Sequence, residues 1–300
     1  MKMKIGILGL GLIGGSLGFD LRSQGHYVLG VSRRELTCQK AMEIGSVDQA
    51  SVDLSLLVSS ELIFVCTPIG LIVPQIKELI PYLHKNTIIT DVGSVKGPIV
   101  HSISPLWENF IGGHPMAGNT SAGIEAAQFN LFVNCPYVIT PVAKTIKNNL
   151  TLLEEIVRSL GSNVYYCSPE QHDRAVSWIS HIPVMVSAAL IDACLNETDL
   201  EILELAQNLA SSGFRDTSRV GGGNPELGVM MAQYNSQALV NSLHQYRDHL
   251  DSFIKLIEEE NWEVLGEKLL FNQHNRPRFL LENANVELVE IGFHRCYLLK

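Results

Sequence analysis

The sequence predicts an α/β domain with a mostly parallel sheet, followed by an all-helical domain. Short runs rich in Ile and Val alternate with helical stretches up to about residue 167, which is typical of successive βαβ units. Between residues 168 and 280 the patterns are helical, without a strand signal. We therefore expect a first domain at 1–167, a helical second domain at 168–280 and a C-terminal tail at 281–300.

Seven apolar runs are predicted as strands of the first domain. In chain order they read "KIGILGL", "HYVLGV", "ELIFVC", "NTIITDV", "NFIGG", "PYVIT" and "NVYYC". The first run is followed by a helical stretch through Phe19 and Leu21. Because strands alternate with helices, a mostly parallel sheet is expected.

The second domain begins with a strong helix signal. Ser168 is a typical N-cap, Pro169 suits the first helical position and Gln171 completes a capping box. The helix should continue to Leu195, bend at Pro183, and be buried on most sides over 182–190, where it is apolar nearly all round. Two more helical patterns follow, at 201–210 and from 224 towards 259, whereas 286–300 could be a strand or a loose tail.

Composition excludes several classes of protein. The net charge of −9 argues against nucleic-acid binding, which needs a basic face. No run of eighteen apolar residues predicts a transmembrane helix, and the N-terminal run has no signal-peptide cleavage site. Six cysteines lie without C-x-x-C spacing, so we expect a cytoplasmic protein with reduced thiols and no metal site.

A glycine pattern follows the first predicted strand. Gly9, Gly11 and Gly14 form G-x-G-x-x-G between a strand and a helix signal, enclosing Leu12 and Ile13. Such glycines allow a tight turn and close approach of the backbone to a pyrophosphate at a helix N-terminus. The alternative is a glycine-rich turn that only packs helix on strand. We favour a Rossmann-type dinucleotide site made by these five residues.

The end of the second strand indicates which dinucleotide binds. An NAD site usually has Asp or Glu there, but this chain has Ser32, Arg33 and Arg34. Guanidinium groups suit a 2′-phosphate, so the sequence predicts NADP; the alternative is two solvated surface arginines. The segment Cys66-Thr67-Pro68 ends the next clear strand and, by position alone, should pass near the nicotinamide half.

His114 is the candidate catalytic base. Gly112 and Gly113 precede it and allow close backbone approach, here expected towards nicotinamide and substrate, and Pro115 keeps residue 114 out of the helical region. An NADP domain suggests hydride transfer, and oxidation of an alcohol needs a base for the hydroxyl proton. Histidine suits that task near neutral pH.

Five motifs in this order resemble the prephenate/arogenate dehydrogenases of tyrosine biosynthesis. The resemblance covers residues 4 to about 275 and implies a dinucleotide domain followed by a helical dimerisation domain, hence a homodimer. The motifs are "GLGLIGGSL" (9–17), "DVGSVK" (91–96), "GGHPMAG" (112–118), "SHIP" (180–183) and "GFRDTSRV" (213–220).

The resemblance also implies roles for site residues. His114 would be the base, Ser94 would hydrogen-bond near it and the substrate hydroxyl, and Arg219 would hold a substrate carboxylate. Arg215 would support Arg219 or pair with Asp216, and His181 would line the site or be a core histidine. Many prephenate-using members have H-x-P-H, but this chain has Val184 at the second histidine position.

The expected reaction is therefore oxidative decarboxylation of a cyclohexadienol carboxylate, with arogenate favoured over prephenate. Prephenate or dual-substrate cyclohexadienyl dehydrogenase activity is the first alternative. An NADP-dependent β-hydroxyacid dehydrogenase is a second, which the absence of lysine from 169–195 argues against. The third, an NADP-binding redox sensor, would not need His114, Ser94 and Arg219 together.

Overall fold

The computed structural model describes residues 2–118 and 121–280. The chain divides into two compact units, with the division between Ser242 and Leu243. The first unit contains the whole sheet and the helices that cover it, together with most helices of the predicted second domain.

The sheet has eight strands in the order β3-β2-β1-β4-β5-β6-β7-β8. Its neighbours are parallel except for the antiparallel pair β6–β7. The seven predicted runs are confirmed as strands, whereas the three-residue β3 was not predicted. The strands are β1 Lys4–Leu8, β2 Tyr27–Val31, β3 Gln49–Ser51, β4 Leu62–Val65, β5 Ile88–Asp91, β6 Phe110–Pro115, β7 Pro136–Thr140 and β8 Asn163–Tyr166.

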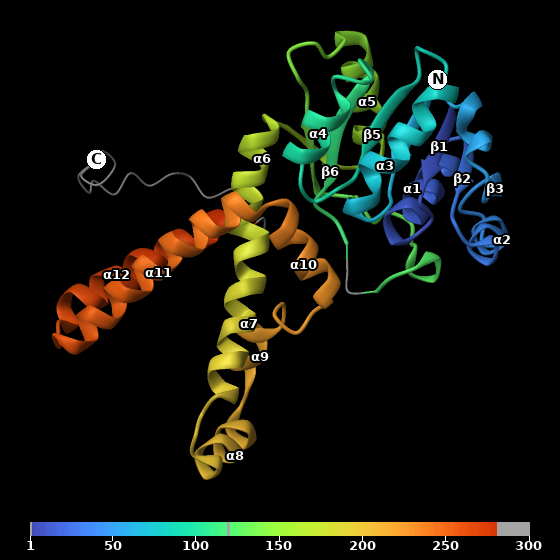
Figure 1. Ribbon diagram of the computed structural model, residues 1–300. Helices are drawn as coiled ribbons and strands as arrows, with labels where there is room; N and C mark the ends of the chain where they lie inside the picture. The colour runs from blue at the N-terminus through green and yellow to red at the C-terminus, as the bar shows by residue number, and fades with distance from the viewer. Residues whose placement is uncertain (1, 119–120, 281–300) are drawn as a thin grey trace. The chain divides into compact units, whose positions relative to one another are not determined.

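Helices cover both faces of the sheet because alternate strand residues point to opposite sides. Ile5 and Ile7 pack in one apolar cluster with α1 and α5, and Leu8 packs in the other with α3 and α4 (Figure 1). The predicted Rossmann-type α/β class is confirmed. The helices of this part are α1 Leu12–Ser23, α2 Glu35–Glu43, α3 Ile69–Leu79, α4 Gly97–Ile103 and α5 Lys147–Ser159, with short 3₁₀ turns at Leu54–Ser59, Ile80–Tyr82 and Ile124–Ala126.

The helix that opens the helical part starts as predicted. Ser168 caps α6 (Pro169–Val176), and the reciprocal bond from Gln171 is present. The next turn, Ser177–His181, is a π-helix, and α7 spans Ile182–Leu195. The N–H of Ile182 bonds to the carbonyl of Ser177, so the expected irregularity at Pro183 takes the form of a widened turn just before it.

Burial of α7 differs from the expectation. Within its own chain this helix buries Ile182 and Ser187, while the rest of it is half-buried or exposed. The run Pro169–Leu195 also has the length of a membrane-spanning helix, and its most apolar 18-residue window has a mean hydropathy of 1.6 and is 17% buried. An apolar helix with so little cover from its own chain needs another surface against it.

Helices alone follow α7 in the described residues. They are α8 Leu200–Leu209, α9 Ser212–Ser218, α10 Pro225–Tyr234 and α11 Ser236–Glu258. The predicted single pattern from 224 to 259 is therefore two helices, because Asn235 has a non-helical backbone conformation, with φ −122° and ψ 31°. The short α9 was not predicted.

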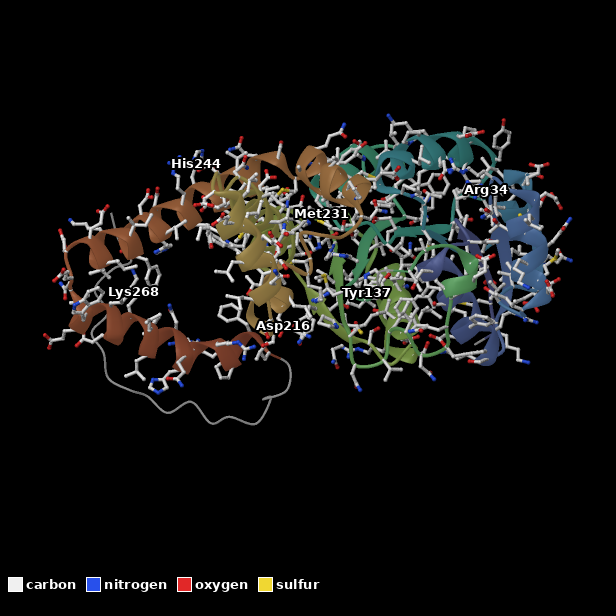
Figure 2. All side chains as sticks on the ribbon, turned by 90° about the horizontal axis from the view of Figure 1, so that it is seen from below. Arg34, Tyr137, Asp216, Met231, His244 and Lys268 are labelled. Carbon is white, nitrogen blue, oxygen red and sulfur yellow. The ribbon has the colours of Figure 1, made fainter. Side chains whose placement is uncertain are left out.

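The second unit contains the later part of α11, then α12 (Trp262–Asn275) and a 3₁₀ turn at Arg276–Phe279. Lys268 on α12 points towards α11 (Figure 2), where its ammonium donates to Ser252 Oγ at 2.7 Å and lies 4.5 Å from the ring centroid of Phe253. The predicted tail, 281–300, lies outside the described residues.

Candidate active site

The glycines of the first loop have different tasks. Gly9 has φ +104°, and a Cβ there would lie 2.8 Å from the Cys66 backbone. A Cβ on Gly14 would overlap the carbonyl oxygen of Gly9. Both glycines are therefore needed for packing within the protein. Beside Gly11 no described atom lies within 4 Å of the Cβ position, so its backbone is open to a ligand.

The N-terminus of α1 is available to an anion. Gly11 is its N-cap and supplies no side-chain hydrogen bond, and no acidic residue lies in the first turn. The first N–H groups, those of Leu12 and Ile13, thus lack the usual cap, and the helix dipole favours negative charge there. This end of α1 fits a pyrophosphate.

A groove of about 1040 Å³ begins at this loop. Arg33 and Arg34 are exposed, and neither makes an ion pair with a described residue; Arg34 is labelled at the edge of the sheet domain in Figure 2. Two unpaired guanidinium groups on one wall fit a phosphate. Eight predicted cofactor residues line the groove: Gly9, Gly11, Ser32, Arg33, Arg34, Cys66, Thr67 and Pro68.

His114 lies at the carboxyl end of β6, with 8% of its surface exposed. Its Nδ1 lies 2.8 Å from Nε2 of His172, and Nδ1 of His172 lies 2.8 Å from Oδ1 of Asp173. The two rings meet edge to face, with centroids 5.0 Å apart. A buried hydrogen-bonded chain thus runs from α6 to the predicted base.

Asp173 joins α6 to the loop between β5 and α4. Its carboxylate accepts the backbone N–H of Lys96 at 2.7 Å and that of Gly97 at 2.8 Å. Two backbone N–H groups and the His172 ring therefore converge on one carboxylate. This network ties α6 to the sheet, which helps explain why the compact first unit extends beyond residue 167. The domain boundary at 167/168 stays a prediction.

A buried ion pair holds the backbone before His114. The ammonium of Lys96 pairs with Asp91 and donates to the carbonyl of Gly113 at 2.7 Å. Asp91 Oδ1 in turn accepts the N–H of Gly113 at 3.2 Å. A Cβ at Gly113 would lie 2.8 Å from the Asp91 carbonyl oxygen, and one at Gly112 would meet Thr140. Protein atoms thus occupy the space beside both glycines where a side chain would lie, and the expected approach to nicotinamide and substrate stays a prediction.

The environment keeps His114 unprotonated at neutral pH. Burial lowers the pKa of His114 well below its usual value, and the nearby Lys96 ammonium lowers it further. A neutral imidazole can accept a proton, so His114 has the protonation state that a general base needs.

His181 is fully buried beside this chain. The Asn235 amide donates to His181 Nδ1 at 3.1 Å and to the Asp173 carbonyl at 2.8 Å. Because Nδ1 accepts, the ring proton of neutral His181 is on Nε2, which has no hydrogen-bond partner among the described residues. Burial lowers the pKa of His181 to about 4. His181 is thus a core histidine that retains one unpaired donor.

Family models identify both parts of the chain. Residues 17–166 match the nucleotide-binding domain of prephenate dehydrogenase, and residues 168–271 match its dimerization domain. This chain belongs to the prephenate dehydrogenase family. It is therefore an oxidoreductase of the prephenate/arogenate type.

Three similar proteins illustrate the range of this family. Arogenate dehydrogenase of Synechocystis is 56% identical, with a TM-score of 0.87 over 93% of this chain and 100% of that one. The Aquifex aeolicus prephenate dehydrogenase in complex with hydroxyphenyl propionate and NAD+ is 27% identical, with a TM-score of 0.87 over 93% and 98%. Prephenate dehydrogenase of Bacillus subtilis is 29% identical over 88% of this chain and 73% of the relative.

The structure of this prephenate dehydrogenase family member does not bring all predicted residues together. Ser94 is half-buried between β5 and α4 and makes no hydrogen bond to His114 among the described contacts. Arg215 pairs with Asp216 at 3.3 Å, the alternative considered for it. Arg219 is exposed at the end of α9, which joins α7 through a bond from Ser187 Oγ to the Thr217 carbonyl. The roles of Ser94 and Arg219 stay predictions.

Several residues of this family member were missed by the sequence interpretation. Asp91 and Lys96 lie within the quoted "DVGSVK", so the motif contained the signal although only its serine was selected. His172 and Asp173 follow a capping box and look like ordinary first-turn residues. Asn235 interrupts a helical pattern without a glycine or proline. Only tertiary contacts show that these polar groups meet.

Proposed function

We propose that this protein is an NADP-dependent arogenate dehydrogenase, which converts arogenate to tyrosine by oxidative decarboxylation. The observation that carries the proposal is His114, a buried neutral imidazole tied to Asp173 through His172 at the carboxyl edge of a dinucleotide-binding sheet. Oxidation of a ring hydroxyl needs a base at that place.

The proposed reaction conserves atoms and charge. His114 Nε2 takes the proton of the substrate hydroxyl while the carbon that carries the hydroxyl loses a hydride. The new carbonyl is conjugated with the carbon that bears the ring carboxylate. That carboxylate leaves as carbon dioxide, and the electron pair of the broken C–C bond makes the ring aromatic and the former carbonyl oxygen a phenolate. The phenolate oxygen then takes back the proton from His114. Arg219 would hold the carboxylate, as the family resemblance implies.

The cofactor would bind along the groove from Gly11 to Arg34, and NADP supplies the hydride acceptor. The open backbone at Gly11 and the uncapped start of α1 fit the pyrophosphate. The unpaired Arg33 and Arg34 fit a 2′-phosphate, which supports NADP over the NAD+ of the Aquifex complex.

Val184 supports arogenate as the substrate. It lies one turn beyond His181 on α7, where a second histidine could hydrogen-bond the side-chain ketone or carboxylate of prephenate. Its Cγ1 is 3.9 Å from the position of a Cβ on Gly228 of α10. The 56% identical Synechocystis protein is an arogenate dehydrogenase. Prephenate or dual-substrate activity is the second candidate, favoured by the Bacillus and Aquifex relatives.

We also infer a homodimer formed by the helical domain, a domain boundary at 167/168 and a cytoplasmic location. The matched dimerization domain and the exposed apolar surface of α7 and α8 support the dimer. The five described cysteines are free, as expected for a reducing compartment.

The function is tested by following the absorbance at 340 nm. Each substrate, arogenate or prephenate, is assayed with each cofactor, NADP or NAD. Arogenate with NADP should give the highest kcat/KM. His114→Ala should lower turnover roughly 10²–10⁴-fold, the usual contribution of a general base, and leave NADP binding nearly unchanged. His84→Ala, at an exposed position, is the matched control. Turnover of His114→Ala within a few-fold of wild type would refute the role of the base, and no turnover of either substrate would refute the function.

A further inference from the structure

We propose that His172 and Asp173 are positioning residues that hold His114 as the tautomer with a bare Nε2. The proposal rests on the proposed function only for its kinetic consequence, because the tautomer itself can be observed without substrate. The geometry is a linear chain of two hydrogen bonds, each 2.8 Å long, that ends on a carboxylate.

The direction of each bond follows from the Asp173 end. Asp173 already accepts two backbone N–H groups, one on each carboxylate oxygen, so it is the acceptor towards His172. Nδ1 of His172 must therefore donate. A neutral His172 then has a lone pair on Nε2, and Nδ1 of His114 must donate to it. The remaining nitrogen of neutral His114, Nε2, is left as the acceptor.

Both rings of the chain are shielded from water. His172 and His114 are both buried, with 2% and 8% of their surfaces exposed. The Lys96 ammonium already contributes a positive charge at this place, paired with Asp91.

The backbone fixes both ends of the chain. At one end, the Lys96 and Gly97 amides hold the carboxylate of Asp173. At the other end, Lys96 and Asp91 bind the backbone of Gly113, the residue before His114. Because Lys96 takes part at both ends, α6 and β6 are fixed against the same loop. The chain thus sets the orientation of the His114 ring as well as its tautomer.

A pair of variants of equal length separates the acceptor from the bulk of the side chain. His172→Gln retains a carbonyl oxygen that can accept from His114 Nδ1, whereas His172→Met cannot accept this bond effectively. We expect His172→Met to lower kcat about 10- to 100-fold, with little change in NADP affinity, and His172→Gln to recover most of the loss. Thermal unfolding of both variants verifies that they are folded.

Nitrogen NMR of histidine-labelled holoenzyme gives the direct measurement, with His114→Ala assigning the His114 signals. Wild-type His114 should have its proton on Nδ1 and a bare Nε2, and His172→Met should shift the proton to Nε2 or mix the two forms. A proton on Nε2 in the wild type would overturn the proposal even if the enzyme is active. Conversely, the expected tautomer in a protein that oxidises neither substrate would refute the proposed function and leave the positioning role supported.

The double variant tests whether His172 acts through His114. In the His114→Ala background, His172→Met should cause no further loss of turnover, because the base that it positions is absent. An equal loss in both backgrounds would show that His172 contributes by another route and would overturn the proposal.

Discussion

At the scale of single residues, the buried histidines determine how the protein responds to acid. His181 is fully buried, and burial lowers its pKa to about 4, against the opposing charge of Asp173. Between the usual histidine pKa of about 6.5 and pH 4, the unfolded chain binds a proton that the folded chain does not. The free energy of unfolding must therefore fall as the pH is lowered through this window.

We expect His181 to account for about 2 kcal/mol of the stability lost between pH 7 and pH 5, since each pH unit in the window costs about 1.4 kcal/mol. Urea unfolding of wild type and His181→Gln, at one fixed protein concentration, measures this difference. His244→Gln, at an exposed position, is the control and should retain the wild-type pH dependence. If the free energy of unfolding of wild type and His181→Gln changed equally with pH, His181 would be protonated as readily in the folded protein as in the unfolded chain.

The proposed preference for arogenate also depends on one residue, Val184. Replacing Val184 by His would place a donor one turn beyond His181, and a missing partner for a polar group costs about 1–3 kcal/mol. We therefore expect Val184→His to raise the ratio of kcat/KM for prephenate over arogenate roughly 5- to 150-fold. Val186→His, on another face of the same helix and also half-buried, is the matched control. An unchanged ratio, or equal shifts in both variants, would show that position 184 does not set the choice.

The candidate base could be selected from the sequence, but the residues that contact it could not. His114 is surrounded by two glycines and a proline, a local pattern that shows a special position. The meeting of His172 with His114 depends on residues 58 positions apart. At Gly112 and Gly113 the sequence shows that a side chain is missing but not which protein atoms occupy the space.

At the scale of elements, the turn between β2 and α2 should decide cofactor preference. Arg33 and Arg34 lie there, on the wall of the groove that begins at Gly11. Hydrogen bonds to charged groups contribute about 1.5–3 kcal/mol, so replacing both arginines by Ala should weaken NADP binding on the order of 10- to 100-fold or more. NAD binding, which lacks the 2′-phosphate, should change little. Titration calorimetry with both nucleotides measures the two affinities.

Arg158→Ala provides the control for this element. Arg158 is an exposed arginine on α5 that pairs with Glu154 at 2.8 Å, and it does not line the groove. Its removal should leave both affinities unchanged. Equal weakening of NADP and NAD by the double arginine variant would show that these side chains support the loop rather than bind a 2′-phosphate.

The elements themselves were predictable where one pattern runs long enough. Six of the seven apolar runs became strands with buried residues inside the sheet, whereas β8 lies at its edge and is mostly exposed. The three-residue β3 has no such run, and its pairing with β2 is a tertiary effect. The break at Asn235 was missed because the helical period continues on both sides of it. The side-chain amide of Asn235 donates hydrogen bonds to the Asp173 carbonyl and to His181 Nδ1, and these two bonds compensate for the interrupted helix.

At the scale of the whole molecule, the apolar surface of the helical part needs a partner. None of the residues of α8 is buried, although Leu205 and Leu209 are large and apolar, with 51% and 70% of their surfaces exposed. The most apolar window of Pro169–Leu195 is mostly uncovered as well. Buried residues of that run, His172, Asp173 and His181, hydrogen-bond inside the fold, which favours a protein partner over a lipid bilayer as the missing cover.

Light scattering should therefore give about twice the chain mass of 33.1 kDa at micromolar concentration. Leu205→Glu with Leu209→Glu places two charges on the exposed face of α8 and should shift the protein towards monomer, because charges are excluded from the core of such interfaces. Leu106→Glu, at a residue of the sheet domain that is 52% exposed, is the control and should stay dimeric. Since a dimer is stabilised by mass action, the unfolding temperature of the wild type should also rise with protein concentration. A wild-type monomer with a concentration-independent unfolding temperature would contradict the dimer and leave the apolar face of α7 and α8 without an explanation.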